Sequence, residues 1–307
     1  MKSSFIKLLP ITLLAFSAQA DDKLTTSGYI DLSYSNVSTD DSEDISNLSL
    51  DSFHLNLDYT LSDDLKISAH VAGNSDEEFN LEQAHLIYSI NESWELLAGK
   101  FLSIQGFEAF HAPDLYQYSY SATLVYPAMM NAVATKYKGD GFFVYGSIMA
   151  SAWNSQETDV ENSAYETAFR LTSIENFTFH LGYVSENIAD GYSQTLTNLW
   201  VSYAIDKLVL AAEYNNVTNW FSENDDGSGW LVMANYSFNE KMALTLRTSG
   251  LEIKDGSNSV TDNTKWTISP SYKISDELSI LAELNVVDDQ ILNQETTTLA
   301  VEVTATF

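Results

Sequence analysis

Apolar and polar residues alternate with a period of two along almost the whole chain, which is the pattern of β-strands with one apolar and one polar face. In residues 299–307 the odd positions hold Leu, Val, Val, Ala and Phe, and the even positions hold Ala, Glu, Thr and Thr. Similar stretches recur near residues 55 and 208, and each runs for roughly 9–12 residues, the length that a tilted strand needs to cross a bilayer. The pattern predicts an all-β protein.

Two kinds of connection separate these segments. Seven are short turns, such as Ser62 to Leu65 and Ser275 to Leu278, in which a polar residue and an acid precede a large apolar residue. Eight are longer, at 37–46, 74–79, 105–129, 154–162, 187–193, 219–228, 254–264 and 289–295. Fifteen connections predict sixteen antiparallel strands, with fourteen or eighteen as the alternatives. Short turns at one end and long loops at the other are typical of an outer-membrane barrel, with the turns periplasmic and the loops extracellular.

The first twenty residues have the three zones of a secretory signal peptide. Lys2 and Lys7 supply positive charge, an apolar stretch follows, and Ala18 to Ala20 forms a small-x-small cleavage site. We expect residues 1–20 to be removed and residues 21–307 to form a single barrel domain. No later stretch is apolar for 18 residues, so a membrane location would require a closed barrel.

The composition narrows the partners and the chemistry. The formal net charge is −29, and removal of residues 1–20, which hold two lysines and no acids, makes it −31. Such a polyanion offers no general basic patch for nucleic acid. The chain has no cysteine, which excludes disulfides and thiolate metal sites.

Periodicity alone leaves open whether the apolar face meets lipid, as in a barrel, or a shared core, as in a soluble exported sandwich. Three features favour lipid. The chain ends in Phe307 on the apolar face, a feature that the barrel assembly machinery reads. Aromatic residues gather at the short-turn ends of strands, as in an interfacial girdle: Trp94, Tyr137, Phe142, Phe177, Tyr203, Phe238 and Tyr272. The long loops hold twenty acids and one base, Lys254, which suggests an acidic outer rim that attracts cations bridging to lipopolysaccharide.

The longest connection, residues 105–129, is the candidate constriction loop. It carries six aromatic residues but only two acids, Glu108 and Asp114. Loops of this length are usually functional or disordered, and its aromatic rings would pack best against a lumen wall. A barrel of sixteen strands leaves an aqueous channel. We therefore predict that the loop folds inward and that its two acids face strand-borne bases across the pore: Lys100, Lys136, Arg170 and Arg247.

The stretch from Ala98 through Lys100 and Phe101, followed by Gly106, Glu108, a Tyr/Ser run, Pro127 and Tyr137, resembles the OmpL-like β-barrel porin family. The resemblance covers about 40 residues, and the chain as a whole resembles a Gram-negative outer-membrane porin. Two positions depart from the family pattern, because Tyr120 and Ala132 stand where Arg and Gly are usual. The resemblance implies a channel for small hydrophilic solutes in the outer membrane.

Enzymatic chemistry finds little support. No Gly-x-Ser-x-Gly motif occurs, and the alternation places His54, His70, His85 and His180 toward the lumen rather than toward lipid. We predict no catalytic residue, no cofactor and no metal site, and a passive porin that prefers cations. A plugged barrel serving as adhesin or structural protein, and an outer-membrane hydrolase, are the rivals; the solute and the oligomeric state, including a homotrimer, stay open.

Overall fold

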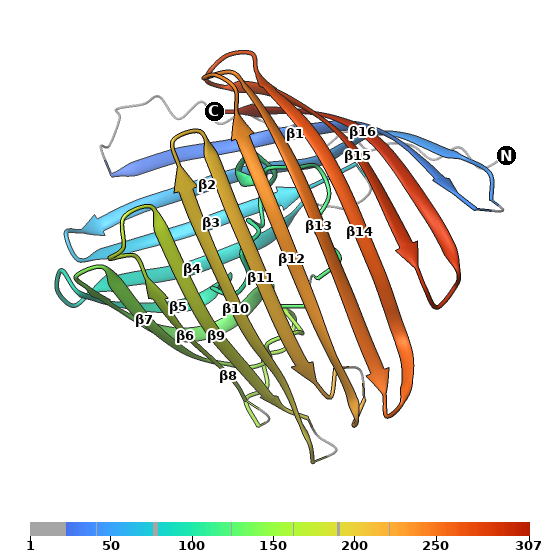
Figure 1. Cartoon of the computed structure of the whole chain (residues 1–307). Coiled ribbons are helices and arrows are strands. Elements are labelled where there is room, and N and C mark those ends of the chain that lie inside the picture. Colours follow the sequence, from blue (N-terminus) through green and yellow to red (C-terminus); the bar gives the residue numbers. More distant parts are fainter. Residues whose placement is uncertain are drawn as a thin grey trace, which may run out of the picture.

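Alternation of apolar and polar residues produces sixteen antiparallel strands that close on themselves (Figure 1). The computed structural model describes residues 23–40, 42–75, 79–123, 125–161, 163–188, 191–220 and 222–307. The proposed signal peptide lies outside these ranges. Among the described residues, no helix is both long and apolar enough to cross a membrane.

The strands follow one another around the barrel in chain order. They are β1 (Leu24–Thr39), β2 (Ile45–Ser62), β3 (Leu65–Gly73), β4 (Asn80–Ser89), β5 (Trp94–Leu102), β6 (Met129–Gly139), β7 (Phe142–Met149), β8 (Ala164–Leu171), β9 (Phe177–Asn187), β10 (Ser193–Ile205), β11 (Leu208–Thr218), β12 (Asp225–Ser237), β13 (Met242–Asp255), β14 (Asn258–Lys273), β15 (Leu278–Asp289) and β16 (Gln294–Thr306). The 3₁₀ helix η1 (Ala112–Asp114) lies between β5 and β6. The predicted count of sixteen strands is confirmed.

Pairing of the first and last strands closes the barrel. β1 and β16 are antiparallel, in register from Tyr29 opposite Thr306 to Thr39 opposite Thr296. Phe307 continues this ladder, because its amide donates to the Gly28 carbonyl at 3.0 Å. Every described strand therefore has a neighbour on both sides, which is the condition for a sheet in lipid.

Each strand presents its two faces as the alternation predicts. On β13, Leu246 is 50% exposed on the outside whereas its neighbour Arg247 is 2% exposed and points inward. Aromatic side chains near the short turns touch across strands, with ring centroids 4.9 Å apart for Trp94 and Tyr137 and 6.1 Å apart for Tyr137 and Phe142. An apolar outside bounded by half-exposed aromatic rings matches a surface that faces lipid.

The connection between β13 and β14 departs most from the prediction. The sequence predicts a long loop over residues 254–264, but β13 runs to Asp255 and β14 begins at Asn258. The two strands therefore extend as a hairpin beyond the predicted ends, with Gly256 in the left-handed region at φ 59°. Glycine adopts this conformation without the steric cost that a β-carbon adds, so a tight turn replaces the loop.

Candidate functional site: a loop seated in the lumen

The connection between β5 and β6, described over residues 103–123 and 125–128, folds into the barrel and is called the inward loop below (Figure 1). The loop contacts residues on many strands of the barrel wall, from Glu166 on β8 to Tyr29 on β1. The predicted inward course of residues 105–129 agrees with this path.

Carboxylates of the wall hold the backbone of the inward loop. Glu166 on β8 accepts from the amide of Ile104 at 3.1 Å, Glu213 on β11 accepts from that of Phe107 at 3.1 Å, and Glu283 on β15 accepts from that of Ser119 at 3.1 Å. All three glutamates are at most 3% exposed. These three contacts fix the loop on widely separated strands, because a buried polar group that loses its partner costs about 1–3 kcal/mol.

Small residues on the wall let the loop approach closely. A β-carbon at Gly229 of β12 would collide with the side chain of Thr123, and one at Gly182 of β9 would collide with the amide group of Gln105. Thr123 is fully buried and accepts from Asn215 Nδ2 at 3.0 Å. The absence of a side chain at each of the two glycines thus leaves the space that a loop side chain occupies; each such space is called a seat below.

Among the predicted pore residues, Glu108 and Arg247 meet. Arg247 Nη1 lies 2.5 Å from Glu108 Oε1, and the two side chains are 0% and 2% exposed, in that order. Gln117 also donates to Glu108 at 2.8 Å, while Arg247 donates to the Ser119 carbonyl at 2.8 Å. The pair is therefore enclosed between the inward loop and β13, where the two opposite charges compensate each other.

Arg170 and Lys136 point into the lumen on the other side of the loop, but neither meets a loop acid. Both cations lie over the ring of Phe143, at 5.0 Å for Lys136 and 4.9 Å for Arg170. Arg170 also lies 4.8 Å from the ring of Trp200 and donates to His180 Nδ1 at 3.2 Å. Aromatic faces attract cations, so these rings hold both half-buried side chains against the wall.

Asp114 and Lys100 lie elsewhere. Asp114 ends η1 with an exposed carboxylate and forms no ion pair within the described part of the chain. Lys100 pairs with Ala84 and Asn131, shares the outward parity of Trp94 on β5, and lines an outer groove with Val133 and Ile148. Lys100 therefore does not face the loop, contrary to the prediction.

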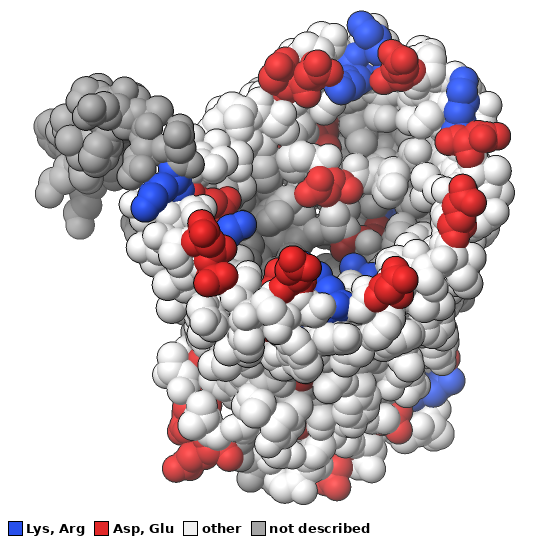
Figure 2. Space-filling view, turned by 90° about the vertical axis from the view of Figure 1, so that its left-hand side faces the viewer, with Lys and Arg blue, Asp and Glu red and all other residues white. Residues whose placement is uncertain are grey.

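Acidic groups gather on the wall opposite Arg170. Asp31 on β1, Asp51 on β2 and Glu302 on β16 have carboxylate oxygens within 4.8 Å of one another. β16 and β8 are eight positions apart in a ring of sixteen strands, so the acidic group and Arg170 occupy opposite walls. Figure 2 shows one mouth of the barrel, where acidic and basic side chains surround a hollow.

Several residues that hold the loop are not among the predicted pore residues. They include the three wall glutamates and Lys265, whose Nζ donates to Ser119 Oγ at 2.6 Å and to the Tyr120 carbonyl at 2.9 Å. The signal for the glutamates in the sequence is a lone acid at an inward strand position between apolar neighbours, as in Ala212-Glu213-Tyr214 and Ala282-Glu283-Leu284.

Burial in the lumen changes the acidity of the loop tyrosines. Desolvation raises the pKa of Tyr118 to about 12 and that of Tyr120 to about 12. For Tyr118 a hydrogen bond with Ser33 opposes this effect on the pKa, and for Tyr120 the charge of Glu108 adds to it. Both phenols are therefore protonated at neutral pH, and the Tyr118 hydroxyl forms a hydrogen bond with Ser33 Oγ at 3.1 Å.

The family follows from a match over most of the chain. Residues 9–291 match the family model described as Gram-negative porin. The chain belongs to the Gram-negative porin family. The match is to the family as a whole, and the narrower OmpL-like resemblance stays a prediction. Membership places the porin in the outer membrane, as predicted.

Solved structures of low identity share the fold. The outer-membrane channel DcaP of Acinetobacter baumannii has a TM-score of 0.71 at 12% identity, covering 92% of this porin and 97% of that chain. The anion-selective porin from Comamonas acidovorans has a TM-score of 0.71 at 12% identity, covering 92% and 99%. OmpT of Vibrio cholerae in a trimer form has a TM-score of 0.65 at 15% identity, covering 93% and 100%. No curated protein matches the sequence.

Proposed function

We propose that this porin lets small hydrophilic solutes and ions diffuse through its lumen, past a constriction formed by the inward loop. The observation that carries the proposal is that buried polar contacts fix the loop inside the barrel. Cavities of about 340 Å³ and 360 Å³ lie beside it, the first under η1 and the second against Arg170 and Trp200. A sixteen-stranded barrel is too wide for its own side chains to fill, which supports a water-filled path. The proposal includes no catalytic step and no cofactor.

Charges on opposite walls give the proposed path a transverse field. Arg170 and Lys136 supply the positive side. Asp31, Asp51 and Glu302 supply the negative side, and they share at least one proton because their oxygens lie within 4.8 Å of one another. Glu108 and Arg247 hold the loop instead of facing solutes, because the pair is enclosed. Rings of charge set ion preference, and the net charge of −31 expected after removal of residues 1–20 favours cations.

Conductance in planar bilayers tests the channel and its selectivity. We expect stepwise currents and, across a KCl gradient, a reversal potential that indicates preference for K⁺. Arg170→Met should strengthen this preference and Asp51→Asn should weaken it, because each removes charge from one wall. Folded protein that gives no stepwise current would reject the channel and favour the rival, a barrel closed by its own loop that acts as an adhesin or structural protein.

The surroundings of the porin are proposed on separate grounds. The lipid-facing aromatic rings and acidic loops suit outer-membrane lipid and, through divalent cations, lipopolysaccharide. Phe307, 58% exposed at the end of β16, is the proposed signal for the barrel assembly machinery. The trimer form of the V. cholerae protein supports a homotrimer, which mass measurement in detergent would test.

A further inference from the structure

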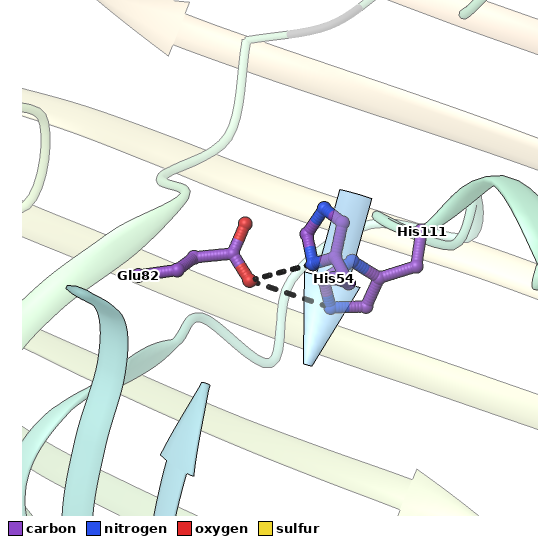
Figure 3. A group of neighbouring side chains, drawn as sticks. All are labelled: His54, Glu82 and His111. Carbon is purple, nitrogen blue, oxygen red and sulfur yellow. Dashed lines mark ion pairs between the residues drawn. The ribbon is translucent and has the colours of Figure 1, made fainter. Parts of the chain in front are cut away.

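A cluster of two histidines and one glutamate connects the inward loop to the barrel wall. His54 belongs to β2, Glu82 to β4 and His111 to the inward loop, directly before η1. Figure 3 shows both imidazole rings directed at one carboxylate oxygen of Glu82. His54 Nδ1 lies 3.4 Å and His111 Nε2 lies 3.9 Å from Glu82 Oε2.

A β-bulge brings Glu82 into the lumen. On β4, Gln83 pairs with His70 and Leu81 pairs with Val71, so that Glu82 between them has no partner on β3. Leu81 is exposed on the outside and Gln83 is buried inside. The extra residue turns the Glu82 carboxylate inward beside the side chain of Gln83, and bulges often re-aim side chains in this way at functional sites.

The polar atoms at the centre of the cluster are buried and lack hydrogen bonds. The His54 side chain is 7% exposed and the Glu82 side chain 11% exposed. Among the described residues, His54 Nδ1 and Glu82 Oε2 have no hydrogen-bond partner, and the contacts of these atoms are the 3.4 Å and 3.9 Å approaches within the cluster. Native proteins rarely leave buried polar atoms in this condition, and a bound ion is one of the ways in which such atoms are satisfied.

The spacing of the donor atoms fits a zinc ion. Tetrahedral Zn²⁺ with bonds of about 2.0–2.1 Å places its ligand atoms about 3.3 Å apart. The distances from Glu82 Oε2 to His54 Nδ1 and His111 Nε2, 3.4 Å and 3.9 Å, approach this value, and all three donor atoms lie within 4.8 Å of one another. Two histidines with one glutamate form a known zinc ligand set, with a fourth position left for water.

Tyr29 on β1 supports both imidazoles from outside the cluster. Its ring stacks on His54 with centroids 4.5 Å apart and an interplanar angle of 9°. Its hydroxyl lies 3.3 Å from His111 Nδ1, so that the ring nitrogen remote from Glu82 has a hydrogen-bond partner. Metal-binding histidines usually have such a partner, because it fixes the tautomer and the ring orientation.

We infer that His54, Glu82 and His111 form a Zn²⁺ site in the lumen, and that the bound metal ties the inward loop to β2 and β4. The site differs from the proposed charged walls of the pore. It does not depend on conduction, because a barrel closed by its loop would still present these three ligands.

Calorimetric titration of ZnCl₂ into the EDTA-treated full-length protein, folded in detergent, tests the inference. We expect one Zn²⁺ per chain, no comparable binding of MgCl₂, and a higher thermal-unfolding midpoint with zinc. Glu82→Gln and His111→Gln each remove one ligand at nearly constant volume and should weaken binding at least tenfold. Tyr29→Phe should weaken it about 10–100-fold through the lost outer contact. His85→Gln, on the same strand as Glu82 but outside the cluster, is the matched control and should bind as the wild type does.

Three results would overturn the site. The first is no saturable zinc binding by the wild type, and the second is unchanged zinc binding by both ligand variants. The third is that Glu302→Gln loses zinc binding while Glu82→Gln keeps it. The last result would assign the metal to the carboxylates of Asp31, Asp51 and Glu302. Migration on gels without boiling checks that each variant is folded. His111 lies in the loop rather than in a strand, so its variant tests the site even where Glu82→Gln disturbs the barrel.

Discussion

Glu108 of the inward loop and Arg247 of β13 form an ion pair with Oε1 and Nη1 2.5 Å apart, and both side chains are almost completely enclosed. A buried charge that loses its partner is strongly destabilising, by about 3–5 kcal/mol. We predict that Arg247→Met lowers the free energy of unfolding by about this amount, because Glu108 stays buried and uncompensated. Denaturant titration in detergent measures the change.

The exposed pair between Lys254 and Glu252 provides the control for this variant, since its side chains are 46% and 40% exposed. Lys254→Met should leave stability unchanged within error. The double variant Glu108→Gln with Arg247→Met should cost less than the sum of the single variants. Equal effects of Arg247→Met and Lys254→Met would show that the ion pair does not hold the loop.

The seat for Thr123 at Gly229 gives a second prediction. Gly229→Ala inserts a methyl group against a fully buried side chain, and overpacking of this kind costs about 1–3 kcal/mol. We expect lower stability and a displaced loop, seen as faster proteolysis within residues 103–128. Gly146→Ala on β7 is the matched control, because no atom lies within 4 Å of its added carbon. Identical behaviour of the two variants would argue against close seating of the loop.

The buried tyrosines of the inward loop predict that the stability of the folded porin depends on pH in the alkaline range. Burial raises the pKa of Tyr118 and of Tyr120 to about 12, against an ordinary value of 10.0. The folded state therefore favours the neutral phenols. Their contribution to stability is complete below pH 10 and is lost as the pH rises from 10 to 12, because the unfolded chain ionises first. Phenolate absorbance should show a late phase that shrinks in Tyr120→Phe. A titration of the folded porin that coincides with that of the denatured chain would contradict the burial of these rings.

The outward face of β13 provides a test of contact with lipid. Leu246 lies within β13 opposite Ile268 of β14 and is 50% exposed, whereas Met242 begins the strand at the short turn and is 48% exposed. Leu246→Arg should cost about 2–4 kcal/mol on folding into bilayers, and Met242→Arg about 0–1 kcal/mol. Urea titration in liposomes measures both. Equal costs would mean that the apolar face does not meet a bilayer.

The strands, and the side of the sheet that each side chain occupies, were predictable because apolar and polar residues alternate with a period of two. β13 and β16 are two strands that follow this pattern. The position of Lys100 was also readable, since it shares its parity with Trp94 and Leu96, which face outward. The inward turn of Glu82 was not predictable, because a bulge adds one residue and breaks the parity locally.

The wall residues that contact the inward loop could not be predicted from the sequence either. The predicted set of two acids and four bases contains the pair Glu108 and Arg247 but did not single it out. The contacts of Ile104, Phe107 and Ser119 with wall glutamates join residues 62 to 164 positions apart. No local pattern encodes such contacts, because they depend on how far the loop reaches across the closed barrel.

Single-channel recording of the wild type beside a variant lacking residues 109–121 tests most directly whether the inward loop narrows a water-filled lumen. We predict stepwise currents from the wild type and a several-fold larger unitary conductance from the shortened protein, with both migrating as folded barrels. Equal unitary conductances, or no current from either protein, would mean that the inward loop does not form a constriction in an open pore.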